Sequence, residues 1–280
     1  MQIAVIGVGL IGGSIAVSAR ERLGAFVSGF DLDARSLELA LERGLIDRAC
    51  GSVAEAVADA RAVFVAVPVG GALESVLAVL EAAPAECVVT DTGSTKRALV
   101  ASVADPRFVG GHPLAGTEHA GTSFARADLF DGAAWYLTPS SRTARDGLER
   151  LRELLSGLGA QPSPVSAERH DRLMASVSHL PHVLANALVC EAASMPSADG
   201  DPPFAAGPSF RDITRVAGAP SAIWTDIYVQ NADLLDAAIG RAIDSLQEFR
   251  AALAAGDAVR LTALNEAAAA ARAQLFGGPR

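Results

Sequence analysis

Two polar clusters near the middle of the chain carry residue types that could move a proton. His112 follows the apolar residues 108–109, and Pro113 biases its backbone toward an extended conformation. A histidine on a loop beyond a strand end can act as a base near neutral pH, although it could instead only satisfy a loop carbonyl. The second cluster, residues 91–96, reads Asp-Thr-Gly-Ser-Thr-Lys and also follows an apolar stretch. Both clusters are therefore expected to open toward one crevice.

A third polar cluster lies in a helical pattern further along the chain. Four residues spaced by four share one helix face, and they are His170, Met174, Ser178 and His182. They could be core groups with satisfied hydrogen bonds, or they could line a polar pocket. Pro181 removes one N–H and clashes with the carbonyl of Val177, so we expect a kink. No carboxylate or cysteine completes a convincing ligand set, so we expect no metal site.

Two arginines, Arg211 and Arg215, are four residues apart and should share one helix face. Guanidinium groups bind carboxylates in a bidentate manner, which suits a substrate that carries carboxylates. A solvated face with an internal pair to Asp212 is the alternative.

The start of the chain has the pattern of a dinucleotide-binding loop. Gly7-Val8-Gly9-Leu10-Ile11-Gly12 fits GxGxxG, follows a short apolar run and opens a helical pattern. Helix N-terminal N–H groups and the helix dipole favour phosphates at such a loop. Asp31 ends the next expected strand and could bond a ribose 2′-hydroxyl, which predicts NAD rather than NADP. Val67-Pro68 ends another strand and is expected over the cofactor crevice, or it is an ordinary strand end.

The elements that must position these residues change in kind along the chain. Short Val-rich stretches alternate with helical patterns up to residue 165, which predicts a doubly wound parallel sheet. The expected strands are 2–6, 25–30, 62–67, 87–90, 108–109, 134–137 and 160–165, and the expected helices are 10–22, 34–43, 71–82, 95–103 and 143–158. Beyond that the helical patterns are 167–194, 209–217, 220–254 and 257–275, with a loop at 195–208. We therefore predict an α/β Rossmann domain over 1–166 and an all-α domain over 167–280.

Composition narrows the possible functions. Half of the 280 residues are hydrophobic, and the net charge is −9 without a basic run, so nucleic acid is not an expected partner. The three cysteines form no CxxC pair, which suits a reducing cytoplasm. We expect no signal peptide, no membrane span, no membrane partner and no appended regulatory domain.

Taken together, the motifs resemble the prephenate dehydrogenase family, which includes arogenate and cyclohexadienyl dehydrogenases. The matching segments are GVGLIGGS, DTGSTK, GGHPLAGTE, SHLPH and FRDITRVA, in that order, followed by Trp224. The resemblance implies a helical dimerisation domain, a homodimer, and NAD-dependent oxidative decarboxylation of prephenate in tyrosine biosynthesis.

The resemblance also implies roles for single residues. His112 would accept the proton of the substrate's C4 hydroxyl, and Ser94 would hydrogen-bond that hydroxyl or the imidazole. Arg215 would bind a substrate carboxylate. Other substrate-binding positions are Ser178, His182, Glu118 and Arg211, where relatives often have lysine at the position of Arg211.

Two alternatives stay open at this point, and a third is disfavoured by the lysine content of the chain. Arogenate or an amino-substituted prephenate would use nearly the same pocket. A β-hydroxyacid dehydrogenase relies on a helical lysine, whereas the only lysine of this chain is Lys96. A non-catalytic NAD-responsive regulator would keep the glycine loop but would not need His112, Ser94 and Arg215 together.

Overall fold

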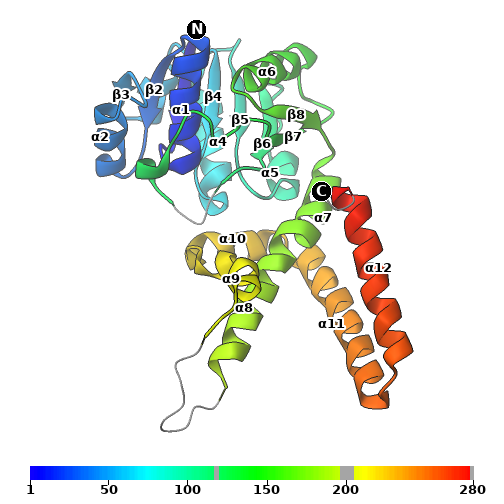
Figure 1. Cartoon of the computed structure of the whole chain (residues 1–280). Coiled ribbons are helices and arrows are strands. Elements are labelled where there is room, and N and C mark those ends of the chain that lie inside the picture. Colours follow the sequence, from blue (N-terminus) through cyan, green and yellow to red (C-terminus); the bar gives the residue numbers. More distant parts are fainter. Residues whose placement is uncertain (117–119, 196–204, 278–280) are drawn as a thin grey trace. The chain divides into compact units, whose positions relative to one another are not determined.

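The computed structural model describes residues 1–116, 120–195 and 205–277 (Figure 1). Two compact units, Met1–Ala232 and Asp233–Arg280, can be distinguished, and each is described by itself. The first unit holds the sheet together with the helices that directly follow it. The division that we expect at residue 166, between a Rossmann domain and a helical domain, is a functional assignment and stays a prediction.

An eight-stranded sheet forms the centre of the first unit, in the order β3-β2-β1-β4-β5-β6-β7-β8. Its neighbouring strands run parallel except for β6 and β7, which pair antiparallel. The strands are β1 (Gln2–Ile6), β2 (Phe26–Phe30), β3 (Arg48–Ala49), β4 (Ala62–Val65), β5 (Val88–Asp91), β6 (Phe108–Pro113), β7 (Ala134–Thr138) and β8 (Gln161–Pro164).

The expectation of parallel strands throughout is wrong at β6 and β7, which pair antiparallel. Parallel neighbours need a long crossover, usually a helix. The described part of this connection holds only the 3-10 turn Thr122–Phe124.

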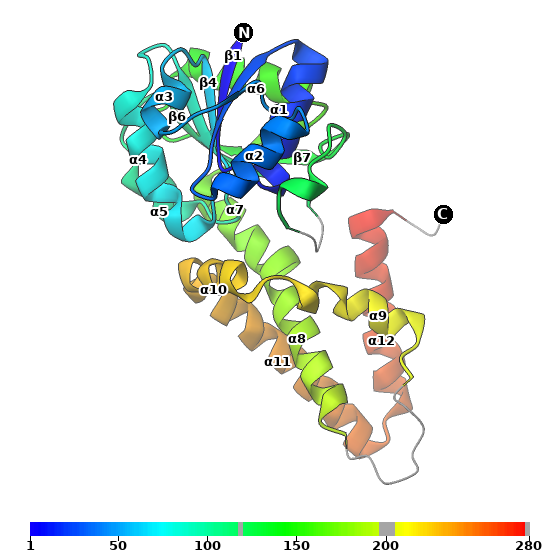
Figure 2. The same ribbon diagram turned by 90° about the vertical axis from the view of Figure 1, so that its left-hand side faces the viewer.

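Helices cover both faces of the sheet, and alternate residues of β1 show why. Ile3 and Val5 belong to one apolar core, which also contains residues of α1, α2 and α6, whereas Ile6 belongs to the other core with residues of α3, α4 and α5 (Figures 1 and 2). These helices are α1 (Leu10–Leu23), α2 (Ala34–Glu42), α3 (Val53–Val57), α4 (Ala72–Ala82), α5 (Arg97–Ser102) and α6 (Arg145–Gly157). The doubly wound α/β prediction is therefore confirmed, while the short β3 and α3 were not expected.

A long helical segment follows the sheet. It consists of α7 (Ala167–Met174), a π-helical turn (Ala175–His179) and α8 (Leu180–Ala193). The wider π turn comes directly before the turn that contains Pro181, where an ordinary α-helix would clash with the carbonyl of Val177. The disturbance predicted at Pro181 thus takes the form of a π turn.

Two of the expected C-terminal helices are interrupted. α9 (Pro208–Thr214) gives way at Arg215 to a 3-10 turn, Arg215–Gly218, so Arg211 and Arg215 do not share one α-helix as predicted. The helix expected over 220–254 is divided at Asn231 into α10 (Ser221–Gln230) and α11 (Ala232–Ala255). Part of the expected 195–208 loop, residues 196–204, lies outside the described residues.

The second unit is a helical hairpin made of most of α11 and of α12 (Ala258–Phe276). Gly256 links the helices with a φ of +62°, a left-handed conformation that favours glycine. The side chain of Asp257 then accepts a hydrogen bond from the backbone N–H of Arg260 (2.9 Å) and caps α12.

One helical segment, Ala167–Ala193, is long and apolar enough to cross a membrane by length and composition. The expectation that no stretch reaches this length is therefore wrong. The segment nevertheless carries His170, Asp171 and His179 as buried side chains that hydrogen-bond to other parts of the unit. Such contacts are typical of a helix packed inside a folded protein.

Candidate active site

The glycine loop between β1 and α1 is shaped by close backbone contacts. Gly7 has a φ of +89°, and a Cβ there would lie 2.5 Å from the carbonyl oxygen of Ala66. A Cβ at Gly12 would overlap the carbonyl oxygen of Gly7, whereas a Cβ at Gly9 would meet nothing within 4 Å. Gly7 and Gly12 therefore permit the turn and its packing, and Gly9 leaves open space in front of the backbone.

Asp31 lies beside this loop at the end of β2. One carboxylate oxygen accepts a hydrogen bond from the backbone N–H of Val8 (2.8 Å), and the other accepts one from Asp33 (2.9 Å). A cavity of about 540 Å³, which we call the glycine-loop cavity, is lined by Gly7, Gly9, Asp31, Val67 and Pro68, among others. All five are predicted cofactor-binding residues, and the structure places them around the glycine-loop cavity.

A second cavity of about 540 Å³, which we call the histidine cavity, also borders this loop. Its walls include Leu10 and Ile11 from the loop and α1, Ser94 after β5, and His112 on β6. Ser178 and Trp224 complete the wall from the helical segments. The loop thus borders both cavities, so a dinucleotide held at Gly9 could reach Ser94 and His112.

Asp91 and Lys96 connect the loop that contains Ser94 to strand β6, which carries His112. They form a buried ion pair, and Asp91 also accepts hydrogen bonds from the backbone N–H groups of Gly93 (2.8 Å) and Gly111 (3.1 Å). Burial lowers the pKa of Lys96, and the charge of Asp91 opposes this shift. The loop of Ser94 is consequently fixed to the strand of His112.

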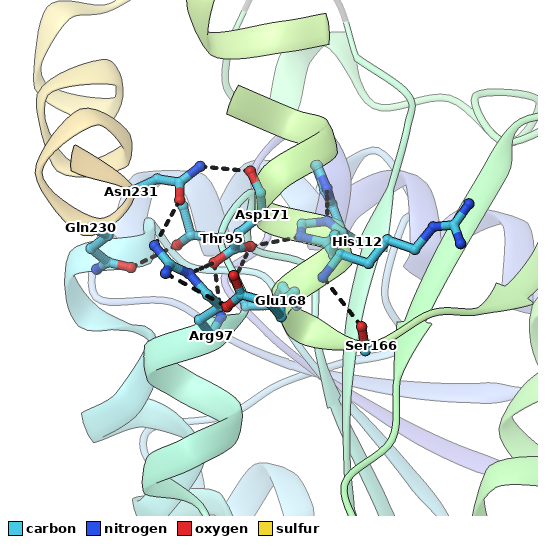
Figure 3. A network of polar contacts seen from close by, with 12 residues as sticks. Thr95, Arg97, His112, Ser166, Glu168, Asp171, Gln230 and Asn231 are labelled. Atoms are coloured by element: carbon cyan, nitrogen blue, oxygen red, sulfur yellow. Dashed lines mark hydrogen bonds and ion pairs between the residues drawn. The ribbon is translucent and has the colours of Figure 1, made fainter. Parts of the chain in front are cut away.

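The imidazole of His112 belongs to a chain of buried polar groups (Figure 3). Its Nδ1 lies 2.9 Å from Nε2 of His170, and Nδ1 of His170 lies 2.7 Å from Oδ1 of Asp171. His170 and Asp171 are 0% and 1% exposed. Desolvation, His170 and Lys96 together hold the pKa of His112 well below its ordinary value of 6.5. His112 is therefore neutral at pH 7 and able to accept a proton.

His182 lies behind the wall of the histidine cavity rather than in it. Its ring stacks on Trp224, and its Nδ1 hydrogen-bonds to the hydroxyl of Tyr228. Burial lowers the pKa of His182, and the backbone of Val216 opposes this shift. His182 thus supports the aromatic wall that Trp224 presents to the cavity.

The predicted arginines are not part of either cavity wall. Both Arg211 and Arg215 are exposed, and Nε of Arg211 donates to the carbonyl of Ala206 (3.3 Å). Ala219 and Pro220, which directly follow the turn of Arg215, do line the histidine cavity. Glu118, the remaining predicted residue, lies outside the described residues.

Several polar residues around the site were missed by the sequence reasoning. The period of four predicts a helix face for His170 but no role, and the sequence pattern does not single out Asp171. Gln230 accepts a hydrogen bond from Thr95 (2.7 Å) and donates to the carbonyl of Val69 (2.8 Å), so the end of α10 braces two strand-end loops (Figure 3). Among the described side chains, no group of three or more histidines, cysteines and acids is arranged to hold a metal ion.

Fold and site together define a Rossmann-type dinucleotide-binding protein whose helical segments close a pocket beside the glycine loop. Residues 15–163 match the family model for the prephenate dehydrogenase nucleotide-binding domain, and residues 166–266 match that for the prephenate dehydrogenase dimerization domain. The chain therefore belongs to the prephenate dehydrogenase family. The first match begins after the glycine loop, so the loop geometry adds to it independently.

Individual relatives agree with this assignment. The chain is 37% identical to prephenate dehydrogenase from Bacillus subtilis over 82% of its length, but it spans only 64% of that protein. It is 33% identical to cyclohexadienyl dehydrogenase from Zymomonas mobilis, covering 91% of this chain and 89% of the relative. The crystal structure of Aquifex aeolicus prephenate dehydrogenase with hydroxyphenyl propionate and NAD+ superposes with a TM-score of 0.90 at 29% identity, covering 98% of both chains.

Proposed function

We propose that this protein oxidatively decarboxylates prephenate to 4-hydroxyphenylpyruvate, with NAD as the oxidant, in tyrosine biosynthesis. The observation that carries the proposal is the shared wall of the histidine cavity. There, Leu10 and Ile11 of the dinucleotide loop border the same hollow as Ser94 and His112. NAD, as the hydride acceptor, and His112, as the proton acceptor, would thus both be within reach of a substrate bound in this cavity.

NAD fits the glycine-loop cavity on the chemistry of its walls. The open space at Gly9 allows a pyrophosphate to approach the backbone, and α1 begins there without a side-chain cap, which leaves N–H donors for phosphate oxygens. Asp31 would bond the ribose hydroxyls, and Val67 and Pro68 would pack on the adenosine half. When bound, NAD supplies the acceptor for the hydride that leaves C4 of the ring.

His112 would take the proton of the C4 hydroxyl as the C4–H bond breaks, and Ser94 would hold the hydroxyl in line. The bond from the ring to its carboxylate then breaks, CO2 leaves, and its electron pair makes the ring aromatic. The ring oxygen regains a proton, so the product is a phenol and the histidine returns to its neutral form. Because aromatisation drives the reaction, the protein mainly has to position the groups and move one proton.

The substrate's two carboxylates require cations, and no lysine or arginine is among the described residues that line the cavity. We assign Arg215 to one of them, because its turn leads directly into Ala219 and Pro220 of that wall. Arg211, Ser178 and Glu118 would orient the rest of the substrate, and His182 would act on it through Trp224. Support for Ser178 is its place in the wall, and support for His182 is its stack on Trp224.

A homodimer is the second part of the proposal. The model matched by residues 166–266 is described as a dimerization domain. The second unit also leaves large apolar side chains exposed, and these are Ile243, Leu246, Leu253, Val259, Leu275 and Phe276. We further propose a boundary at residue 166 between a cofactor domain and a substrate and dimerisation domain, and a cytoplasmic location.

Arogenate is the principal alternative substrate, since it differs only in carrying an amine where prephenate has a ketone. A panel that combines prephenate or arogenate with NAD or NADP separates these possibilities. We expect the highest kcat/KM for prephenate with NAD. A higher value for arogenate would assign the alternative, and no turnover in any combination would favour a non-catalytic NAD-responsive protein.

A further inference from the structure

Asp171 is held as a hydrogen-bond acceptor by groups on three sides. Oδ1 accepts the backbone N–H of Lys96 (2.8 Å), and Oδ2 accepts that of Arg97 (2.9 Å). The guanidinium of Arg97 lies 3.4 Å from Oδ2 (Figure 3). Burial alone would raise the pKa of Asp171, but hydrogen bonds from His170 and from these two amides hold it below its ordinary value. Asp171 is therefore a carboxylate, and it can only accept from His170.

Because Asp171 is a carboxylate, it determines which nitrogen donates in each hydrogen bond from Asp171 through His170 to His112. Nδ1 of His170 must carry a proton to bond with Oδ1 of Asp171 at 2.7 Å. In neutral imidazole the other nitrogen is then an acceptor, so Nε2 of His170 accepts from Nδ1 of His112 at 2.9 Å. A proton on Nδ1 of His112 leaves Nε2 as its basic nitrogen, on a residue that lines the histidine cavity.

We propose that His170 and Asp171 are positioning residues that hold His112 in the tautomer with Nδ1 protonated, so that Nε2 is the atom that accepts the substrate's proton. This inference rests on the proposed function for its catalytic consequence, although the tautomer itself does not depend on it. Neither residue lines the cavity, so both act through His112.

The groups that surround His170 and Asp171 are consistent with a positioning role. Tyr136 on β7 packs edge-on against His170, with ring centroids 5.9 Å apart, and the side-chain amide of Asn231 contacts both the carbonyl of Asp171 and Nδ1 of His179 on the π turn. Lys96 is paired with Asp91, and Arg97 is paired with Asp171. With Nδ1 donating to Asp171 and Nε2 accepting from His112, both ring nitrogens of His170 have a partner.

Two substitutions at His170 distinguish this role from a merely structural one. In His170→Gln the side-chain amide is long enough to accept from His112 while it donates to Asp171. In His170→Asn the shorter amide can replace only the contact with Asp171. Both variants are polar and buried at the same place, so they make a matched pair. His179→Gln removes a buried histidine of the same helical segment whose Nδ1 contacts the side-chain amide of Asn231 (3.2 Å) and not His112.

The tautomer is read by nitrogen NMR of histidine-labelled protein without substrate, with the His112 signals assigned from His112→Asn. We expect an Nδ1-protonated His112 in the native protein, in His170→Gln and in His179→Gln, and loss of this preference in His170→Asn. With prephenate and NAD, we expect kcat of His170→Asn to fall about 10- to 100-fold with little change in KM, and His170→Gln to recover most of the loss.

Two results would overturn the proposal. One is an Nε2-protonated His112 in the native protein, which would mean that the donor direction is reversed. The other is an equal kcat and an equal tautomer in His170→Asn and His170→Gln. If the native protein turned over no substrate, the proposed function would fail while the NMR result still decided the tautomer.

Discussion

The imidazole of His182 lies nearly parallel to the indole of Trp224, with ring centroids 3.6 Å apart and an interplanar angle of 12°. Trp224 lines the histidine cavity, so the stack fixes the shape of one wall. We predict that Trp224→Leu raises KM for prephenate by roughly 3- to 10-fold, because an aromatic stack is worth about 0.5–1.5 kcal/mol. Trp224→Phe keeps a ring for His182 and should change KM less. Equal KM values in the two variants would show that the stack does not shape the pocket.

Replacement of His112 should remove the base and leave binding largely intact. We expect His112→Asn to lower kcat by about 10²-fold or more with little change in KM. In the native enzyme, activity falls as the pH drops through the pKa of His112, because the protonated ring cannot accept a proton. Since that pKa is well below 6.5 in the protein without substrate, the acidic limb of kcat/KM should have its midpoint below pH 6.5, and the variant should lack it. A near-native kcat with the limb intact would exclude His112 as the base.

Asp31 should decide between the two nicotinamide cofactors. Its carboxylate lines the glycine-loop cavity and would repel the 2′-phosphate of NADP. Asp31→Ser is expected to reduce the preference for NAD, measured as the ratio of kcat/KM values, by about 10-fold or more. Asp33→Asn is the matched control, because it removes a nearby charge outside the cavity wall and keeps a residue that can cap α2. A native enzyme that used NADP as well as NAD would contradict this assignment.

His179 should make the folded protein sensitive to acid. Burial lowers its pKa to about 4, so the unfolded chain binds a proton between pH 6.5 and 4 that the folded protein does not. The stability contribution is present above pH 6.5 and is lost as the pH falls toward 4. Between pH 7 and pH 5 the loss from this residue is about 2 kcal/mol. Urea unfolding at both pH values should therefore show a smaller decrease for His179→Gln, and an identical decrease would refute the prediction.

Much of the cofactor site could be predicted from the sequence, because its signals are local. The pattern of Gly7, Gly9 and Gly12 after a strand and the position of Asp31 depend on residues that are close along the chain. The period of four likewise predicts one shared helix face for His170, Ser178 and His182, although a π turn (Ala175–His179) interrupts that period in the structure. What that face contacts depends on the tertiary structure, and for this reason the bonds from His170 to His112 and Asp171 could not be foreseen.

Helix interruptions were harder to predict for a similar reason. Asn231 separates α10 from α11, yet the apolar pattern continues across it. Its side chain donates to the carbonyl of Asp171 (2.9 Å) and accepts from Arg97 (3.2 Å), two residues far away in the sequence. The direction of β7 was also not predictable, because an apolar run of four residues (134–137) carries no information about which way the strand runs.

The central claim, that oxidation and decarboxylation occur together in the histidine cavity, is tested most directly by measuring both products in one reaction. Purified protein is mixed with prephenate and NAD, and NADH and CO2 are followed at the same time. We predict that the two appear in equal amounts, that 4-hydroxyphenylpyruvate accumulates with them, and that His112→Asn slows both equally. CO2 release without NADH, or NADH formation without CO2, would contradict the account.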